Sequence, residues 1–303
     1  MGSDYITTDN CRRNENMKIN GCDCSIVIKT THHEFDVPYS EETIREAVSV
    51  LQEEAAIEGD GVCKAITKKS GVTGCIVTPL TINTASLLLY LAMGSAGLHN
   101  YVTETKGLYR CTLNLLPLED TNGFDLIQDR GNERRVFEQC RVNSFELRFE
   151  KEQMVKLKLD ICGERSASAY LYTDIVKRKS EERFYGNNVF FMINGFDYKY
   201  IYGLTLHVKK DTGTKTEIWI RRSLKKGKEL PAIIENLTIT ARLMRDKYEY
   251  RHYGCFRITL KELVAVSDET NVNSSDTVIG PCRYYVSGGV VSEVFIFGEE
   301  KIS

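Results

Sequence analysis

Two adjacent histidines, His32 and His33, together with Glu34 and Asp36, form the part of this chain best suited to metal chemistry. Imidazole nitrogens and carboxylate oxygens are common protein ligands of divalent metals. Neighbouring side chains of an extended chain point to opposite sides, however, so the two histidines could not easily bind one ion. We therefore interpret this segment as a surface loop and predict no metal site.

A second candidate is a segment with the ending of a phosphate-binding loop, Gly213-Thr214-Lys215-Thr216. A true phosphate loop needs a further glycine at a fixed distance before this ending, and the chain lacks it. A hairpin turn explains the segment better, because alternating apolar residues flank it. The chain also contains no G-x-S-x-G and no H-E-x-x-H sequence. We therefore predict no catalytic residues, no cofactor and no enzymatic activity.

Ten cysteines are scattered along the chain without a single C-x-x-C pair. Zinc sites with cysteine ligands usually need two such close pairs, whereas only Cys22 and Cys24 lie near each other. Cys111 stands in an alternating run, YRCTLNLL, where a thiol serves as a small apolar side chain. We therefore expect reduced, structural cysteines in a protein made in a cytoplasm.

The composition is that of a globular protein, because 42% of the 303 residues are hydrophobic and 27% are charged. A formal net charge of −2 argues against the class of proteins that coat duplex DNA, which are strongly basic. The longest apolar run, residues 85–93, is too short to cross a bilayer. The N-terminus has neither the basic nor the apolar part of a secretory signal. We expect no membrane insertion.

Strict alternation of apolar and polar residues predicts a long β-hairpin between residues 140 and 163. Burying its apolar face requires that Leu147 lies opposite Leu157, because a slip by one residue would bury the lysines. The other apolar pairs are then Phe145 with Leu159 and Phe149 with Val155, and the last apolar residue of the second strand is Ile161. The polar face carries Glu146, Arg148, Lys156 and Lys158, with Glu146 facing Lys158, a favourable pair.

The same alternation recurs in the second half of the chain and predicts a second hairpin over residues 204–220. It matches the first hairpin at a constant offset, with Leu204 corresponding to Phe145 and Ile220 to Ile161, which is consistent with an internal duplication. Further strands are expected at residues 25–29, 109–115, 124–127, 135–137, 188–193, 237–243, 256–260 and 290–297.

Two helices are expected. Ser40 could cap the first, over residues 41–55, because apolar residues at positions 44, 47, 48, 51 and 55 have helical spacing. Thr84 could cap the second, over residues 85–93, and Gly94 could end it. The predicted fold class is therefore mainly β, a β-sandwich or barrel with long hairpins and one or two short helices. We expect an N-terminal arm over residues 1–38 and two β-rich halves, 39–170 and 171–303, the second forming a pseudo-repeat in the same sandwich.

The order of these segments resembles the major tail tube proteins of long-tailed bacteriophages. In that family a glycine-led strand precedes a short apolar helix ending in glycine, and three further strand segments follow. The last of these opens with Cys-x-Val-Asn-Ser and leads into a hairpin that ends in glycine. The corresponding segments are GCIVTPL (74–80), LLLYLAMGS (87–95), YRCTL (109–113), FDLI (124–127) and CRVNS (140–144), with the hairpin ending at Gly163. The resemblance covers residues 44–163 and, more loosely, 188–298.

The resemblance implies a structural virion protein whose copies form rings, of six or three subunits, that stack into the tail tube. The hairpin of residues 145–161 would line a continuous barrel through which DNA passes without specific binding during ejection. Its partners would be itself and the tail terminator, tape-measure and distal tail proteins. It would be assembled in the cytoplasm of the bacterial host and end in the virion.

A second class of function competes with this one. A β-sandwich binding module of a virion, specific for a carbohydrate or a receptor, would expose an aromatic platform. The single tryptophan, Trp219, lies within a predicted strand, but sixteen tyrosines keep this alternative open.

Overall fold

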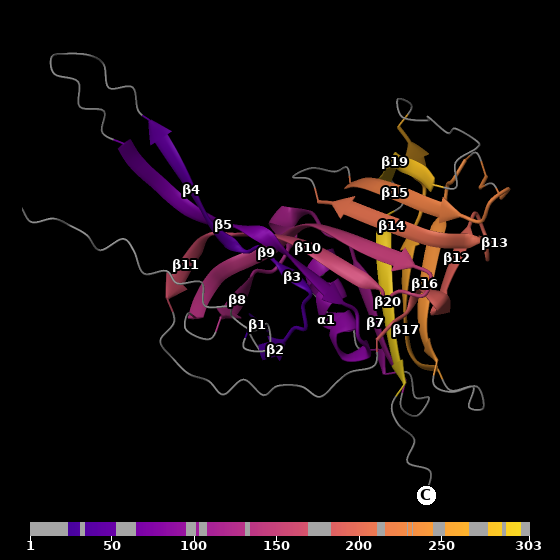
Figure 1. The fold of residues 1–303 in the computed structure, drawn as a ribbon, viewed down its shortest axis with the longest axis horizontal. Coiled ribbons are helices and arrows are strands. Elements are labelled where there is room, and N and C mark those ends of the chain that lie inside the picture. The colour runs from indigo at the N-terminus through magenta and orange to yellow at the C-terminus, as the bar shows by residue number, and fades with distance from the viewer. Residues whose placement is uncertain are drawn as a thin grey trace, which may run out of the picture.

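The computed structural model describes residues 24–30, 34–52, 65–94, 101–102, 108–130, 134–168, 183–210, 216–228, 230–231, 233–244, 252–266, 278–286 and 289–297. These residues form antiparallel sheets with one α-helix (Figure 1), which confirms the prediction of a mainly β fold. The larger sheet has 13 strands and the smaller one has seven. Within these residues, no helix has the length and apolar character needed to span a membrane.

The larger sheet is built around a path of eight hydrogen-bonded strands. In order they are β18 (Leu263–Ala265), β19 (Val278–Val286), β15 (Thr216–Leu224), β14 (Ile201–Lys209), β9 (Arg134–Glu150), β10 (Lys156–Gly163), β5 (Ala65–Pro79) and β3 (Glu41–Glu42). Five strands branch from this path: β4 (Arg45–Gln52), β8 (Phe124–Asp129), β11 (Arg165–Ser168), β1 (Ser25–Lys29) and β2 (Glu34–Asp36).

The predicted central hairpin is formed by β9 and β10. Leu157 pairs with Leu147 and Lys158 pairs with Glu146, as the alternation predicts. The predicted pair of Phe149 with Val155 is not part of this ladder. Val155 precedes β10, and its N–H donates to the Phe184 carbonyl. A register shift follows Asp160, where the β-bulge adds one residue to β9. The seven apolar residues of the hairpin are all buried: Phe145, Leu147, Phe149, Val155, Leu157, Leu159 and Ile161.

The predicted second hairpin is formed by β14 and β15, with Leu206 opposite Ile220. Its first strand pairs with β9, where Leu206 lies opposite Leu147. The two hairpins therefore lie edge to edge in one sheet and bury their apolar residues on the same side. The expected halves 39–170 and 171–303 both contribute strands to both sheets, as adjacent blocks of strands, and the internal duplication stays a hypothesis.

The described part of the expected N-terminal arm belongs to the folded body. The predicted strand at residues 25–29 is β1, which pairs with β8 along five residues and with β2. Ile26 and Ile28 are fully buried. Residues 1–23, the remainder of the expected arm, lie outside the described residues.

The prediction of a helix over residues 41–55 is wrong. The described part of this segment forms β3 and β4, which pair with β5 through residues 76–77 and 65–73 respectively. An apolar spacing of three and four residues fits a helix, but Val48 and Val50 are β-branched residues that also suit strands. Pairing with a strand fifteen residues long, β5, decides in favour of the sheet.

The second predicted helix exists as α1 (Ile82–Met93), but it begins one turn earlier than expected. Thr81 is the N-cap, and its hydroxyl accepts a hydrogen bond from the Thr84 N–H. In return, the Thr84 hydroxyl accepts a hydrogen bond from the Thr81 N–H. This reciprocal capping explains why Thr84 itself is inside the helix. Gly94 ends the helix in the left-handed conformation, as predicted.

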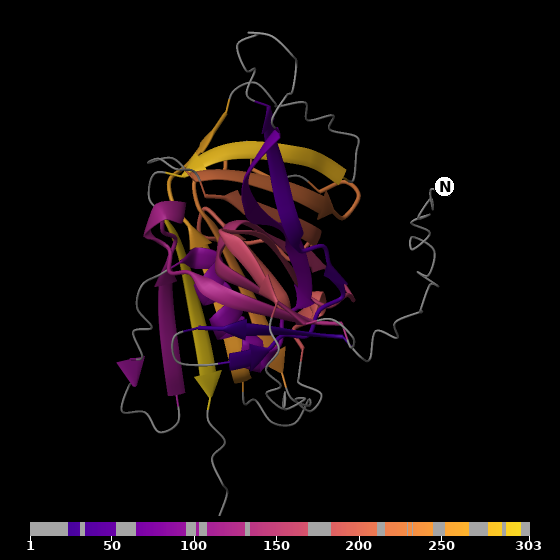
Figure 2. The same ribbon diagram turned by 90° about the vertical axis from the view of Figure 1, so that its left-hand side faces the viewer.

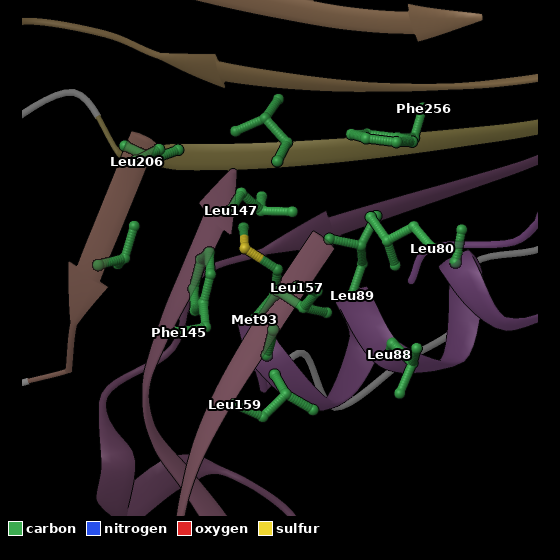
Figure 3. Close-up of a cluster of buried hydrophobic side chains, with 14 of the residues drawn as sticks. Leu80, Leu88, Leu89, Met93, Phe145, Leu147, Leu157, Leu159, Leu206 and Phe256 are labelled. Atoms are coloured by element: carbon green, nitrogen blue, oxygen red, sulfur yellow. The ribbon is translucent and has the colours of Figure 1, made fainter. Parts of the chain in front are cut away.

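The smaller sheet lies across the inner face of the two hairpins. Its order is β13 (Phe196–Asp197), β12 (Val189–Ile193), β16 (Leu237–Met244), β17 (His252–Leu260), β20 (Val290–Phe297), β7 (Leu108–Asn114) and β6 (Tyr101–Val102). Phe149 from β9 contacts Phe191 and Phe256 of this sheet, with ring centroids 6.2 and 6.3 Å apart. Helix α1 packs beside these strands, and its Leu89 and Met93 reach the core near Leu157 (Figure 3). Two short 3₁₀ turns, Leu118–Asp120 and Gly186–Asn188, complete the described elements.

Candidate assembly surfaces

The polar residues of both hairpins share one face of the larger sheet, here called the polar face. Strand register places three parallel rows on it. The first row is Val77, Lys158, Glu146, His207, Trp219 and Arg283, and the second is Cys75, Asp160, Ser144, Lys209, Glu217 and Tyr285. The third row is Pro79, Lys156, Arg148, Thr205 and Arg221. Two rows mix acidic and basic residues, and the charged residues of the third row are all basic.

Ion pairs and hydrogen bonds hold the charges of the polar face within the sheet. Lys158 Nζ lies 3.1 Å from Asp160 Oδ1, and the Ser144 hydroxyl donates to Asp160 Oδ2 at 2.6 Å. Arg148 pairs with Glu146 two residues before it. Burial works to lower the pKa of Lys158, but the hydrogen bond and charge of Asp160 outweigh it and raise the pKa. These charges are therefore compensated locally.

His207 occupies the centre of the first row, where it is half-buried between Glu146 and Trp219 in the register. Burial lowers its pKa below 6.5, against the opposing effect of Glu146 and Asp160. The lowered pKa favours the neutral imidazole on the polar face.

The edges of the central hairpin are both occupied within the same chain. The outer side of β10 pairs with β5, and the outer side of β9 pairs with β14. The open sides of the larger sheet lie further out, at β18 and the first part of β19 on one side and at β3 on the other. Among the described residues, β19 pairs with β18 only through Tyr284, Tyr285 and Val286, and β3 pairs with β5 alone.

A two-stranded ribbon projects from one end of the larger sheet (Figure 1). It consists of residues 47–52 of β4 and 65–71 of β5, which pair with each other, whereas β10 pairs with β5 only from Val72 onward. Arg45, Glu46 and Ala47 at its base are consecutive and all exposed, so both faces of the chain are open there. In Figure 2 the same ribbon lies in front of the sheets. An isolated two-stranded ribbon is only marginally stable in water.

Six exposed large apolar residues lie on β12, β13, β14 and the segments that precede β12 and β16. We call this set the tip surface: Tyr185, Phe190, Met192, Phe196, Tyr202 and Ile233. Beside it is a shallow hollow of about 620 Å³ lined by Glu150, Lys151, Tyr202, Gly203, Thr205 and Ser223. Lys151 Nζ lies 4.9 Å from the centre of the Tyr202 ring, a cation–π contact.

A single buried lysine stands out among the charged groups of the described core. Lys210 follows β14 and is 3% exposed, and its amine has no hydrogen-bond partner among the described residues. Burial lowers its pKa to about 7. A Cβ placed on Gly94, at the end of α1, would lie 3.1 Å from this amine, so the lysine points at the carboxyl end of the helix.

The structure brings the predicted hairpin residues together and adds surfaces that the sequence analysis missed. The ribbon and the tip surface were not predicted from the sequence, because the sequence does not show which strands lack a neighbouring strand. One signal was available for the tip surface: the run VFFMI of β12 lacks polar alternation and thus has apolar residues on both faces. His32 and His33 lie outside the described residues, as do residues 211–215, and Glu34 pairs with Lys29 at 3.4 Å.

No protein-family model matches the chain, and no curated protein is significantly similar to it.

Proposed function

We propose that this chain is a structural virion protein that assembles into stacked rings, forming the tail tube of a long-tailed bacteriophage. One observation carries the proposal. Among the described residues, both edges of the central hairpin are paired inside the chain, whereas no further strand pairs with β18, with the first part of β19 or with β3. On β18, the Leu263 N–H donates to the Glu235 carbonyl. Open sheet edges carry unpaired N–H and C=O groups, and joining copies edge to edge satisfies them.

Edge-to-edge pairing of unlike sides is a heterologous contact, and it closes into a ring when the rotation between copies allows it. Eight strands form the path from β18 to β3, so three copies would supply a barrel of about 24 strands. With a strand spacing of about 4.8 Å and a tilt of about 40°, such a barrel has a radius of about 24 Å. Six copies would double that radius, so we favour rings of three subunits.

The polar face would line the channel in this arrangement. A duplex that must slide through needs a wall that does not hold it by many phosphate contacts, because binding strengthens with each basic residue engaged. The locally paired charges of Glu146, Arg148, Lys158 and Asp160 suit this requirement. The hairpin of residues 145–161 would be the central part of the wall. Terminator, tape-measure and distal tail proteins would bind the ends or the channel of the tube.

The hollow beside Tyr202 favours a second candidate function, the carbohydrate-binding module of a virion. Tyr202 is 39% exposed and is surrounded by carboxylates and hydroxyls that could bind sugar hydroxyls. The hollow is open, however, and only one aromatic ring lines it. We therefore place this function second.

Electron microscopy of the purified full-length protein over a range of concentrations tests the proposal. We expect rings and hollow tubes as concentration rises, with sedimentation showing a ring-sized species. A chain that stays monomeric at high concentration and binds a glycan array would support the second candidate and refute the first.

A further inference from the structure

The end of the larger sheet that holds the turn of the central hairpin carries several exposed lysines. We call them the lysine rim: Lys151, Lys225, Lys226 and Lys228. Among the described residues, none of their amines lies within ion-pair distance of a carboxylate. They differ in this from Lys158 on the polar face, whose charge is compensated by Asp160. The rim is therefore an uncompensated cationic surface.

The strand register brings the lysine rim together at neighbouring strand ends. The last residue of β15 pairs with the first residue of β14, and the last residue of β9 pairs with Gly203 of β14. Lys225 directly follows β15, and Lys151 directly follows β9. A hydrogen bond from the Lys228 N–H to the Lys225 carbonyl, at 3.1 Å, closes the turn of residues 225–228. Because β14 alone separates the two strand ends, they lie about 10 Å apart across the sheet.

Two tyrosines at the start of β14 connect the lysines to one another. Lys151 Nζ lies 4.9 Å from the centre of the Tyr202 ring, and Lys228 Nζ lies 5.9 Å from the centre of the Tyr200 ring. The backbone is joined in the same places, because the Tyr202 carbonyl accepts from the Lys151 N–H at 2.8 Å and the Tyr200 carbonyl accepts from the Lys225 N–H at 3.0 Å. The rim and the two rings therefore form one connected surface.

The hollow of about 620 Å³ is continuous with this surface, because Lys151 and Tyr202 belong to both. Its lining also provides two hydroxyls and two exposed carboxylates, from Thr205, Ser223, Glu150 and Glu152. Ammonium groups only donate hydrogen bonds, and carboxylates only accept them. A ligand that fits must therefore offer anionic groups to the lysines and hydroxyl donors to the glutamates.

This pairing of requirements distinguishes between the classes of anionic polymer. A nucleic acid strand binds through many phosphate contacts and through bases stacked on free aromatic rings. Here a lysine already lies over each of the two rings, and the two glutamates repel a phosphate chain. An acidic polypeptide offers carboxylates but has few hydroxyl donors. A polysaccharide built from sugar acids offers both groups on every residue.

We propose that the lysine rim and the hollow form one binding site for a carboxylate-bearing polysaccharide. The lysines bind the sugar carboxylates, and Glu150 and Glu152 accept hydrogen bonds from the sugar hydroxyls beside Tyr202. This site goes beyond the proposed assembly, because it does not require rings, and it gives the second candidate function its class of ligand.

Isothermal titration calorimetry of the full-length protein with oligogalacturonate tests the site. We expect binding that weakens as salt is added. The same oligosaccharide with its carboxylates reduced to alcohols should bind at least about tenfold more weakly, because charge-assisted hydrogen bonds are lost. The absence of oligogalacturonate binding at low salt would overturn the proposal.

A double substitution, Lys225→Gln with Lys228→Gln, tests the rim itself. We expect the affinity for oligogalacturonate to fall at least about tenfold, because two cations are removed from the contact. Lys209→Gln is the matched control, since this exposed lysine lies at the other end of β14. It should keep the wild-type affinity, and equal affinities for the double variant and the control would exclude the rim.

Glu150→Ala separates sugar recognition from attraction of any polyanion. Removing this carboxylate relieves repulsion of every anionic polymer, but only the sugar loses an acceptor for its hydroxyls. The ratio of the affinities for oligogalacturonate and for poly-glutamate should therefore fall at least about fivefold. If wild-type protein binds poly-glutamate or a single-stranded oligodeoxynucleotide of equal charge as tightly as oligogalacturonate, the proposal is wrong.

Reductive methylation of lysines, read by mass spectrometry, locates the ligand without any substitution. Oligogalacturonate should protect Lys151, Lys225 and Lys228, while Lys209 reacts at its usual rate. Protection of none of the rim, or of all four lysines equally, would refute the site. Tubes that do not bind oligogalacturonate would refute this site alone, whereas a permanent monomer that binds it would refute the proposed assembly alone.

Discussion

Lys210 is a residue whose burial is costly at neutral pH. Its pKa is about 7 in the folded protein, whereas a lysine amine in water has a pKa of 10.5, the value that applies to the unfolded chain. Between these values the unfolded state binds one more proton than the folded state, so the free energy of unfolding rises with pH across this window.

Replacing the lysine tests this interpretation. We expect Lys210→Met to raise the free energy of unfolding by about 1–3 kcal/mol at pH 7, because it removes an amine buried without a hydrogen bond. The gain should shrink as the pH rises toward 10. Urea denaturation at pH 7, 8.5 and 10 measures it, with the exposed neighbour in Lys209→Met as control. A gain that is the same at all three pH values would contradict the lowered pKa.

Gly74 lies so close to the backbone of residues 43 and 44 that there is no room for a side chain. Its φ is +151°, and a Cβ placed on it would lie 2.5 Å from both the Ile44 Cα and the Thr43 carbonyl oxygen. We expect Gly74→Ala to lower the free energy of unfolding by about 1–3 kcal/mol through this overlap with backbone atoms. Gly71→Ala is the control, because its Cβ would meet only the Gly163 oxygen at 3.6 Å. Equal denaturation midpoints for the two variants would show that residues 43–44 move aside easily.

The ribbon is the element whose removal should separate folding from assembly. Residues 48–70 can be replaced by Asn-Gly, which closes two-residue hairpins well, while Glu46 keeps its partner Val72. We expect the shortened chain to keep its melting temperature within about 4 °C and to lose tubes. Calorimetry and electron microscopy measure the two properties. Loss of the folded state would show that the ribbon packs against the rest of its own chain and stabilises it.

Strand alternation predicted the elements well where both faces of a strand have different surroundings. The register of β9 with β10 followed from Phe145, Leu147, Leu157 and Leu159 alone, because a slip would have buried lysines. The segment 41–52 was mispredicted because its apolar spacing satisfies a helix, and only the distant partner β5 shows that it is a strand. The projecting ribbon and the tip surface could not be predicted, since they depend on which strands lack a neighbour.

At the scale of the whole molecule, the described residues include strand edges at the sides of the larger sheet and a ribbon that projects along its strands. Among the described residues, the sides of the larger sheet at β18–β19 and β3 lie across the strands, whereas the ribbon continues along them. Rings and stacks should therefore respond to different substitutions.

A substitution at the side of the sheet should abolish rings themselves. Val264 in β18 is 56% exposed at the outermost strand of the path. We expect Val264→Asp to weaken ring formation at least about tenfold, because it places a charge in the proposed contact between neighbouring subunits. Light scattering after size exclusion should show monomers. Rings of normal size would exclude β18 from the contact.

The pairing of β7 with β20 sets the moment at which this protein can finish folding. Asn114 lies opposite Val291, and Leu108 lies opposite Phe297. During synthesis, β7 can therefore pair with β20 only after more than a hundred further residues have been added to the chain. Apart from the two residues of β6, β7 has no other described strand to pair with. Such distant contacts slow folding, and here they also postpone it until the ribosome has synthesised residues 290–297. Nascent chains would thus be unable to polymerise prematurely, and a truncation before residue 290 should yield an insoluble product.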